Sequence, residues 1–177
     1  MTSPEKKPAG KSPGKKSAGK DAEISARTAA RVAAVQALYQ MDLAGTDLND
    51  VIEEFLSVRF TPEGRDETIE GADRTFFADI LRAVLRLQRE IDPLVDEQLA
   101  TGWRLVRVDS ILRAALRAGT AELLDRTDVP ARVVINEYIN VARFFFSDDE
   151  PRVVNGVLDK IAHAVRPKEF EEKPAKS

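Results

Sequence analysis

The chain of 177 residues contains no cysteine and only one histidine, His163. The absence of cysteine excludes disulfide bonds and thiolate metal sites, and it is compatible with a reducing compartment. A single histidine leaves little room for histidine-based catalysis or for a zinc site. We therefore expect a cytoplasmic protein without a bound metal.

Familiar catalytic and membrane signals are missing as well. The sequence has no GxSxG, P-loop or GxGxxG motif, so we expect no enzymatic activity and no cofactor. No stretch approaches the ~18 apolar residues that a membrane span needs. The lysine-rich N-terminus is not followed by an apolar segment, so it does not resemble a secretory signal. We expect no membrane partner.

The charge is unevenly distributed along the chain. The net charge is −3, but residues 1–20 carry six lysines and one glutamate, so the remaining 157 residues carry −8. A domain that binds nucleic acid by itself is normally basic. Any nucleic-acid contact must therefore be local, made by the tail, or shared with a partner.

Low-complexity segments mark both ends of the chain. Residues 1–21 are rich in Lys, Pro, Gly, Ser and Ala, a composition that cannot bury enough apolar surface to offset its ordering entropy. We predict disordered tails over 1–21 and 168–177, and a folded domain over 22–167. The N-terminal tail is either a solubilising segment or a weak RNA-attracting arm, with Lys15, Lys16 and Lys20 as candidate contacts.

Apolar residues between the tails recur at intervals of three and four, and no segment alternates with a period of two. This pattern predicts an all-α fold of about seven helices. Pro93 should break one long helical pattern, and Gly119 in mid-helix indicates a close approach of two helices. The expected helices cover approximately residues 22–44, 47–59, 72–90, 93–99, 108–125, 130–146 and 151–166, with a loop over 61–69 and an anchor of Trp103 and Leu105 before the fifth.

The segment Ala29–Leu43 is the expected centre of the fold. Its surface is apolar nearly all round, as in a helix buried between others. Arg27 and Arg31 lie one turn apart, and we expect both to emerge at its N-terminal end. Together with Tyr39, they could clamp phosphates and stack on an unpaired base. The alternative is two solvated arginines and a core tyrosine.

A second candidate site follows the sixth predicted helix. Asp149, Arg152 and Val153 begin the last helix, and a free helix N-terminus can hold a phosphate. Ser147–Glu150 also has the spacing of a capping box, so plain capping is the alternative. The run Phe144–Phe146 spans ~200° of a helix, which predicts that at least one ring reaches the surface or an interface between lobes.

Three motifs give the chain a specific resemblance. They are ARxxARxxAVQALY over Ala26–Tyr39, VPxxVxINE over Val129–Glu137 and VNGVLDK over Val154–Lys160. In this order and spacing they resemble the NusB family of transcription antitermination factors. The resemblance extends from about Ser25 to Pro167 and implies two small three-helix lobes packed together.

The resemblance also implies a function. It implies a protein that binds boxA leader RNA together with the ribosomal protein NusE, joins the RNA polymerase antitermination complex and promotes ribosomal RNA transcription. A homodimer that hides the RNA surface is a further implied state. The implied RNA-binding residues are Arg27, Arg31, Gln36, Tyr39, Asp149, Arg152 and Val153.

The chain departs from the family pattern in two places, of which the first weakens the expected RNA contact. Thr28 and Ala29 stand at positions that are often basic, and the Phe144–Phe146 run stands where the family often has glycine. The competing interpretation is a helical protein-interaction module without direct RNA binding.

Overall fold

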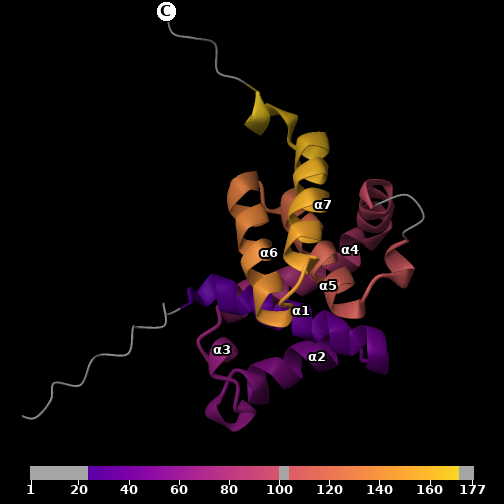
Figure 1. Ribbon diagram of the computed structural model, residues 1–177. Coiled ribbons are helices and arrows are strands. Elements are labelled where there is room, and N and C mark those ends of the chain that lie inside the picture. Colours follow the sequence, from indigo (N-terminus) through magenta and orange to yellow (C-terminus); the bar gives the residue numbers. More distant parts are fainter. Residues whose placement is uncertain (1–23, 100–103, 172–177) are drawn as a thin grey trace, which may run out of the picture.

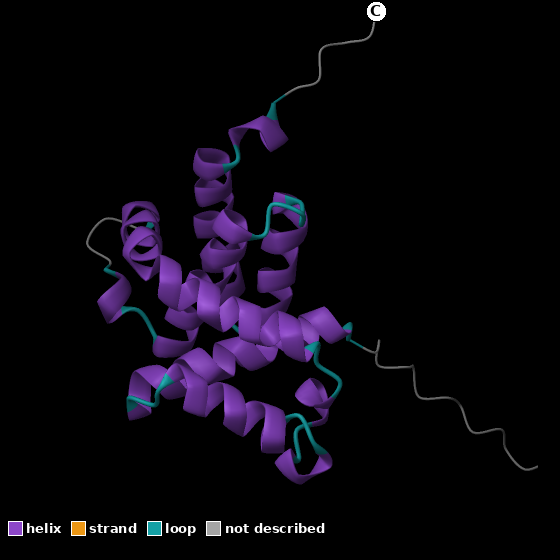
Figure 2. Ribbon diagram, turned by 180° about the vertical axis from the view of Figure 1, so that it is seen from behind, coloured by secondary structure: helices purple, strands orange, loops and turns teal. Residues whose placement is uncertain are grey.

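The computed structural model describes residues 24–99 and 104–171, and these residues form helices and connecting segments without a strand (Figures 1 and 2). This confirms the all-α prediction. The α-helices are α1 (Ala26–Ala44), α2 (Leu48–Glu54), α3 (Glu67–Glu70), α4 (Arg74–Gln98), α5 (Ser110–Asp125), α6 (Ala131–Phe145) and α7 (Glu150–Val165). None of them combines the length and the hydropathy needed to cross a membrane.

Two alanine-rich helices form the interior. Helix α1 packs against α2, α3, α4, α5 and α6, whereas α5 packs against α1, α4, α6 and α7. The prediction that Ala29–Leu43 is buried is confirmed for Ala29–Leu38 but wrong for Leu43, which is 63% exposed. Helix α5 is buried in the same way. Small side chains on both helices allow their neighbours to approach closely. Helix α5 therefore joins the α6–α7 pair to the group built around α1 and α4 (Figure 1).

Helix α1 is bounded by specific caps. The Ser25 hydroxyl accepts a hydrogen bond from the Thr28 N–H at 3.0 Å, so the helix begins at Ala26. The predicted earlier start is wrong for Ile24 and Ser25, and residues 21–23 lie outside the described residues. Gly45 has φ +63° and its N–H bonds to the Met41 carbonyl. This left-handed residue ends the helix as predicted.

The predicted break at Pro93 is wrong, because α4 continues through it to Gln98. Proline lacks an N–H, so only one helical hydrogen bond is lost, the bond to the carbonyl of Arg89. Because Arg89 is exposed, water can bond to this carbonyl instead. Arg117 of α5 donates two hydrogen bonds to Asp92, at 2.9 and 3.0 Å. Packing on both sides of the proline therefore holds the helix together, with Ile91 and Val95 fully buried.

Two connecting segments also differ in detail from their predictions. The segment predicted to be helical to Arg59 is α-helical to Glu54 and continues as a π-helix over Phe55–Arg59. The predicted loop over 61–69 contains a 3₁₀ turn, Pro62–Gly64, and the start of α3. A proline and short polar side chains are compatible with single helical turns, so their presence does not exclude local helix.

The close approach predicted at Gly119 is confirmed. A β-carbon on Gly119 would lie 2.7 Å from Leu158 Cδ1 and 3.3 Å from Tyr138 Cδ2. Glycine therefore lets α5 contact both α6 and α7, which offsets its helix cost of ~1 kcal/mol. Of the predicted anchor, Leu105 is buried as expected, while Trp103 lies outside the described residues.

The loose tail predicted from Lys168 is wrong for residues 168–170, which form a 3₁₀ turn, Pro167–Phe170. The Arg166 guanidinium donates to the carbonyls of Glu122, Leu123, Arg126 and Val129, and so caps the end of α5. The turn itself holds the start of α6. Glu169 accepts a hydrogen bond from the Ala131 N–H at 2.7 Å.

Candidate nucleic-acid interface

The first predicted site residue, Arg31, is not at the surface. Its side chain is 3% exposed, and its Nε and Nη2 atoms donate to the two carboxylate oxygens of Glu122, each at 2.9 Å. Burial opposes the charge on Arg31, but hydrogen bonding and attraction from Glu122 raise its pKa above the ordinary value. The prediction that both N-terminal guanidiniums emerge is therefore wrong for Arg31.

The Arg31 ion pair belongs to a network that links three helices. Arg31 Nη1 lies 3.3 Å from a carboxylate oxygen of Glu137. The same carboxylate oxygen accepts a hydrogen bond from the Thr28 hydroxyl at 2.7 Å. The Ser25 hydroxyl continues the network at 2.8 Å from the Thr28 hydroxyl. The network fixes α1 against α5 and α6, and Thr28 takes part in it as a hydrogen-bond donor.

Tyr138 of α6 lies beside this network. Its side chain is fully buried, and burial together with the nearby Glu122 carboxylate raises the pKa of its phenol well above the usual value. Its hydroxyl has no hydrogen bond of good geometry within the described residues. The phenol therefore stays protonated at physiological pH, and its ring packs against Gly119 of α5.

Arg27 does emerge at the surface, as predicted. It is exposed, and its guanidinium carbon lies 4.6 Å from the centre of the Phe76 ring. Arg31 and Arg126 approach the same ring at 4.9 and 5.3 Å. The aromatic face orients the Arg27 guanidinium by a cation–π contact. Its N–H groups make no ion pair with the residues that the structure describes, so they remain available to an external anion.

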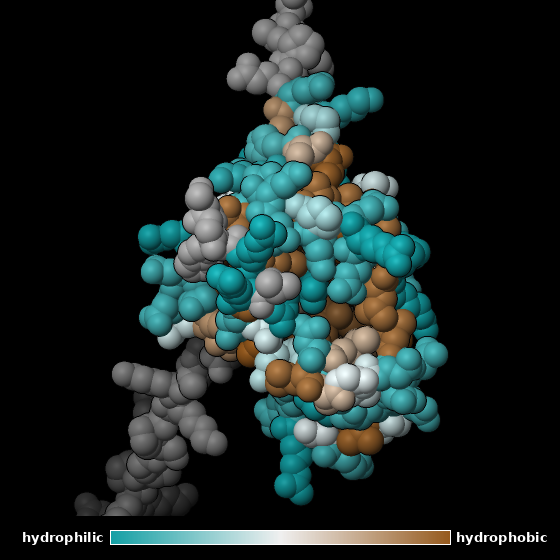
Figure 3. Space-filling model, turned by 90° about the vertical axis from the view of Figure 1, so that its right-hand side faces the viewer, coloured by the Kyte–Doolittle hydropathy of each residue, from teal (hydrophilic) through white to brown (hydrophobic). Residues whose placement is uncertain are grey.

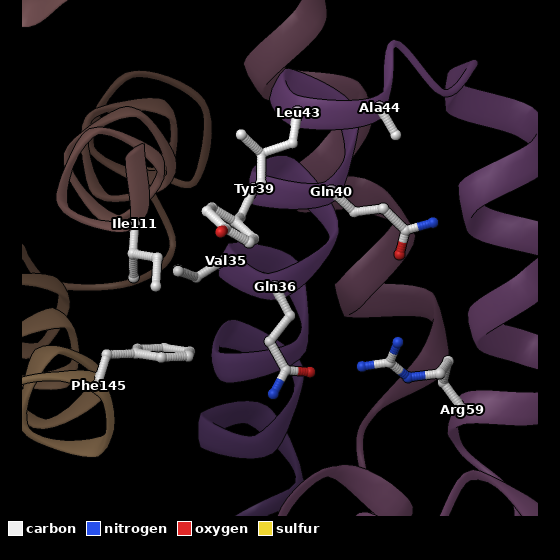
Figure 4. Close-up of a pocket in the computed structure, with 9 residues that line it drawn as sticks. All are labelled: Val35, Gln36, Tyr39, Gln40, Leu43, Ala44, Arg59, Ile111 and Phe145. Atoms are coloured by element: carbon white, nitrogen blue, oxygen red, sulfur yellow. The ribbon is translucent and has the colours of Figure 1, made fainter. Parts of the chain in front are cut away.

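An open groove runs along the second half of α1. It has a volume of about 510 Å³ and a largely apolar lining. Val35 and Tyr39 face Ile111 and Phe145, while Gln36 and Gln40 extend toward Arg59 on the other side (Figure 4). Leu43 at the rim is 63% exposed. The face toward the C-terminal end of α1 shows apolar side chains within a mainly hydrophilic surface (Figure 3).

Two predicted site residues, Gln36 and Tyr39, lie in this groove. Gln36 donates a hydrogen bond to Asp66 at 3.3 Å, and its Oε1 atom is buried without a partner among the described groups. Tyr39 is partly exposed rather than a core residue. An aromatic ring, an amide and an apolar wall can hold either a flat base or an apolar protein side chain.

The turn between α6 and α7 holds the other predicted site residues. Asp149 and Arg152 are exposed and line a second hollow of about 400 Å³, whereas Val153 packs partly against the core. The predicted capping box does not form, because Asp149 is the N-cap and makes no side-chain cap bond. The cap position lies two residues beyond Ser147, so the box spacing does not match the helix start.

The phenylalanine run connects the two hollows. Phe144 is 47% exposed, which confirms that at least one ring reaches the surface. Phe145 lines the groove beside α1, and Phe146 lines the hollow beside Asp149. The end of α6 therefore brings the α1 and α7 candidates into one surface.

Some residues of this surface were not predicted as site residues. Arg59, Ile111 and Leu43 line the groove, but in the sequence they read as ordinary helical positions. Only their approach in the folded chain identifies them. The predicted tail contacts, Lys15, Lys16 and Lys20, lie outside the described residues.

Comparison with known proteins identifies the chain's relatives. The NusB family model matches residues 28–163. The chain belongs to the NusB family. It is 50% identical over 139 residues to the transcription antitermination protein NusB of Rhodopseudomonas palustris strain TIE-1, an alignment that covers 78% of this chain and 80% of that relative.

Solved NusB structures share the fold. NusB of T. maritima aligns with a TM-score of 0.67 and 28% identity, over 85% of this chain and 99% of that one. A chain from a crystal structure of the antitermination factors NusB and NusE in complex with dsRNA aligns with a TM-score of 0.64 and 25% identity, over 78% of this chain and 97% of that one. The family expectation from the three motifs is thereby confirmed.

Proposed function

We propose that this NusB-family protein is a cytoplasmic transcription antitermination factor that binds boxA-type single-stranded RNA together with NusE. Its family membership supports this function, as does the similar fold found in a complex that contains NusE and RNA. The single observation that carries the proposal is the continuous surface formed by α1, the end of α6 and the start of α7. We further propose that the assembled pair joins the RNA polymerase antitermination complex and promotes ribosomal RNA transcription.

The RNA contacts rest on exposed cations. Arg27 is oriented by Phe76, and Arg152 is exposed at the start of α7. Both guanidiniums can contact phosphates, which supply affinity, while unpaired bases supply specificity. Tyr39 remains a candidate for base stacking and Gln36 for a polar contact. Arg31 supports this surface from within, because its buried network holds α1 in place.

The partner contact rests on shape and charge. The body of the chain is acidic, so electrostatic attraction would speed its encounter with a basic ribosomal protein. The groove beside Tyr39, with Leu43 at its rim, offers an apolar site for side chains of NusE. A partner that brings positive charge would also compensate for the two non-basic positions, Thr28 and Ala29, near the RNA.

The function is tested by titrating boxA RNA and a scrambled RNA with the full chain, alone and with NusE. We expect a preference for boxA and markedly tighter binding when NusE is added. The double variant Arg27→Gln/Arg152→Gln should weaken binding by about 1–3 kcal/mol per intimate contact. The variant Lys168→Gln, which removes an exposed charge elsewhere, should bind as the wild type does.

Two results would contradict this proposal. Binding to NusE without any preference for boxA over scrambled RNA would support the helical interaction module. A homodimer that NusE and RNA cannot dissociate would place the groove at a self-association interface, and sedimentation of the free chain at several concentrations would detect it.

A further inference from the structure

An exposed row of arginines on α4 has no role in the surface described above. Arg82, Arg86 and Arg89 are all exposed. At ~100° per residue their side chains leave the helix within about 60° of one another, and Arg82 and Arg89 are about 10 Å apart along the axis. The three guanidiniums therefore form one narrow basic stripe, and an exposed apolar residue, Leu85, lies next to it.

Ion pairs within the chain neutralise only part of the stripe. Arg86 lies 2.5 Å from Asp125, whereas Arg82 and Arg89 make no ion pair with any group in the described part of the chain. A neighbouring acid on α4, Asp79, is 3.8 Å from Arg126. Asp125 therefore neutralises Arg86, and the exposed Glu90 follows Arg89 in the chain, but Arg82 and Arg89 remain two cations without an ion pair among the described residues.

The stripe lies on the same helix as the ring that carries Arg27. Phe76, in the first turn of α4, carries the Arg27 guanidinium on its ring, and Arg126 contacts the same ring. From this point α4 runs across the side of the bundle that is distant in Figure 1 and near in Figure 2. The first arginine of the stripe, Arg82, follows Phe76 by six residues, which is about 9 Å along the helix axis and within reach of an RNA strand held at Arg27.

We propose that the stripe of Arg82, Arg86 and Arg89 binds the phosphate backbone of RNA that flanks the boxA element. This inference rests on the proposed function, because it extends the same RNA from Arg27 onto α4. Guanidiniums held on a helix bind phosphates irrespective of base. The stripe would therefore lengthen the footprint on the RNA and add affinity without adding sequence preference.

The test compares RNA lengths. The full chain with NusE is titrated with boxA RNA, and with the same RNA extended by oligouridine on its 5′ or its 3′ side, at several salt concentrations. We expect one of the two extensions to tighten binding and to steepen its salt dependence. The double variant Arg82→Gln/Arg89→Gln should bind this extended RNA about tenfold more weakly and lower the salt slope by about 1.4, since each phosphate contact on a single strand contributes ~0.7.

A matched control is Lys160→Gln/Lys168→Gln, which removes two exposed charges from the C-terminal part of the chain. It should leave the binding of the extended RNA unchanged. If both extensions bind no more tightly than boxA alone, or if the arginine variant keeps the wild-type salt slope, the stripe does not bind RNA and the inference is overturned. That result is distinct from failure of the proposed function, in which boxA itself would not be preferred.

An acidic protein is the other occupant that such a stripe could bind. It would be revealed if the arginine variant kept wild-type binding to extended RNA but lost retention on purified RNA polymerase. That combination would also overturn the RNA assignment. Circular dichroism of the arginine variant verifies folding, and because both substituted side chains are exposed, its thermal midpoint should match that of the wild type.

Discussion

The two halves of α1 lie in very different surroundings. In the first half Arg31 is enclosed and bonded to Glu122. In the second half Tyr39 lines an open groove and Leu43 is 63% exposed. The difference arises because α4, α5 and α6 surround the beginning of the helix, whereas α6 ends beside its middle at Phe145. Apart from its exposed first turn, the enclosed half mainly serves stability, and the open half offers a surface for recognition.

The strongest test of the enclosed half is Arg31→Met. Removing one partner of a buried ion pair leaves Glu122 uncompensated, so we expect a loss of about 3–5 kcal/mol in the free energy of unfolding. Urea denaturation measures it. The double variant Arg31→Met/Glu122→Met should lose much less than the sum of the single variants, because neither charge remains buried. Additive losses would contradict the idea that the two residues act as a pair.

The second test concerns the packing that encloses the core at Gly119. In Gly119→Ala the new methyl group would lie 2.7 Å from Leu158 Cδ1. Leu158 is fully buried and has little room to move away. We therefore expect the cost of overpacking, about 1–3 kcal/mol, to exceed the helix gain of ~1 kcal/mol. The expected result is a net loss of stability, measured by the urea midpoint.

A control for this substitution exists on α7. Gly156→Ala adds the same methyl group where nothing lies within 4 Å. It should stabilise the protein by about 0.5–1 kcal/mol. If both glycine variants shift the midpoint in the same direction, the close approach of α5 to α7 is not what requires Gly119.

Substitutions in the open half of α1 should change binding rather than stability. We expect Leu43→Lys to change stability by less than about 0.5 kcal/mol, since the side chain is already exposed. The affinity of this variant for NusE should fall about tenfold, as expected for the loss of an apolar contact that contributes ~1.4 kcal/mol. Calorimetric titration of NusE measures the affinity. Unchanged NusE binding would remove the rim of the groove from the proposed partner surface.

The smallest expected effect lies at the C-terminal turn, away from both halves of α1. The Ala131 N–H bonds to Glu169 and lowers the pKa of that carboxyl group. A carboxylate with a lowered folded-state pKa stabilises the protein above its unfolded pKa of ~4.3, and this contribution is lost as the pH falls through the folded-state value.

Glu169→Ala should therefore lower stability near pH 7 by no more than about 1 kcal/mol, the typical contribution of an N-cap contact, because the side chain is 36% exposed,. Unfolding curves for wild type and variant should converge as the pH drops below ~4. A difference that persists in acid would show that the carboxylate charge is not what stabilises the turn.

The sequence by itself determined the all-α class, the approximate positions of most helices and the buried character of the first half of α1. Its apolar residues recur at helical intervals, and the end of α1 at Gly45 depends on backbone geometry within a few residues. Three motifs also determined the family. These features are local, or are recorded directly in the order of residues, so they can be recognised without knowing which helices meet.

Only the tertiary structure decided which arginines are exposed and which are buried in ion pairs. Arg27 and Arg31 occupy the same helix one turn apart, yet one lies on the Phe76 ring and the other is paired with Glu122, 91 positions away in the sequence. Pro93 is tolerated for a similar reason, since α5 holds Asp92 from the side. Burial and ion pairing depend on partners distant in the chain, and helical periodicity carries no information about them.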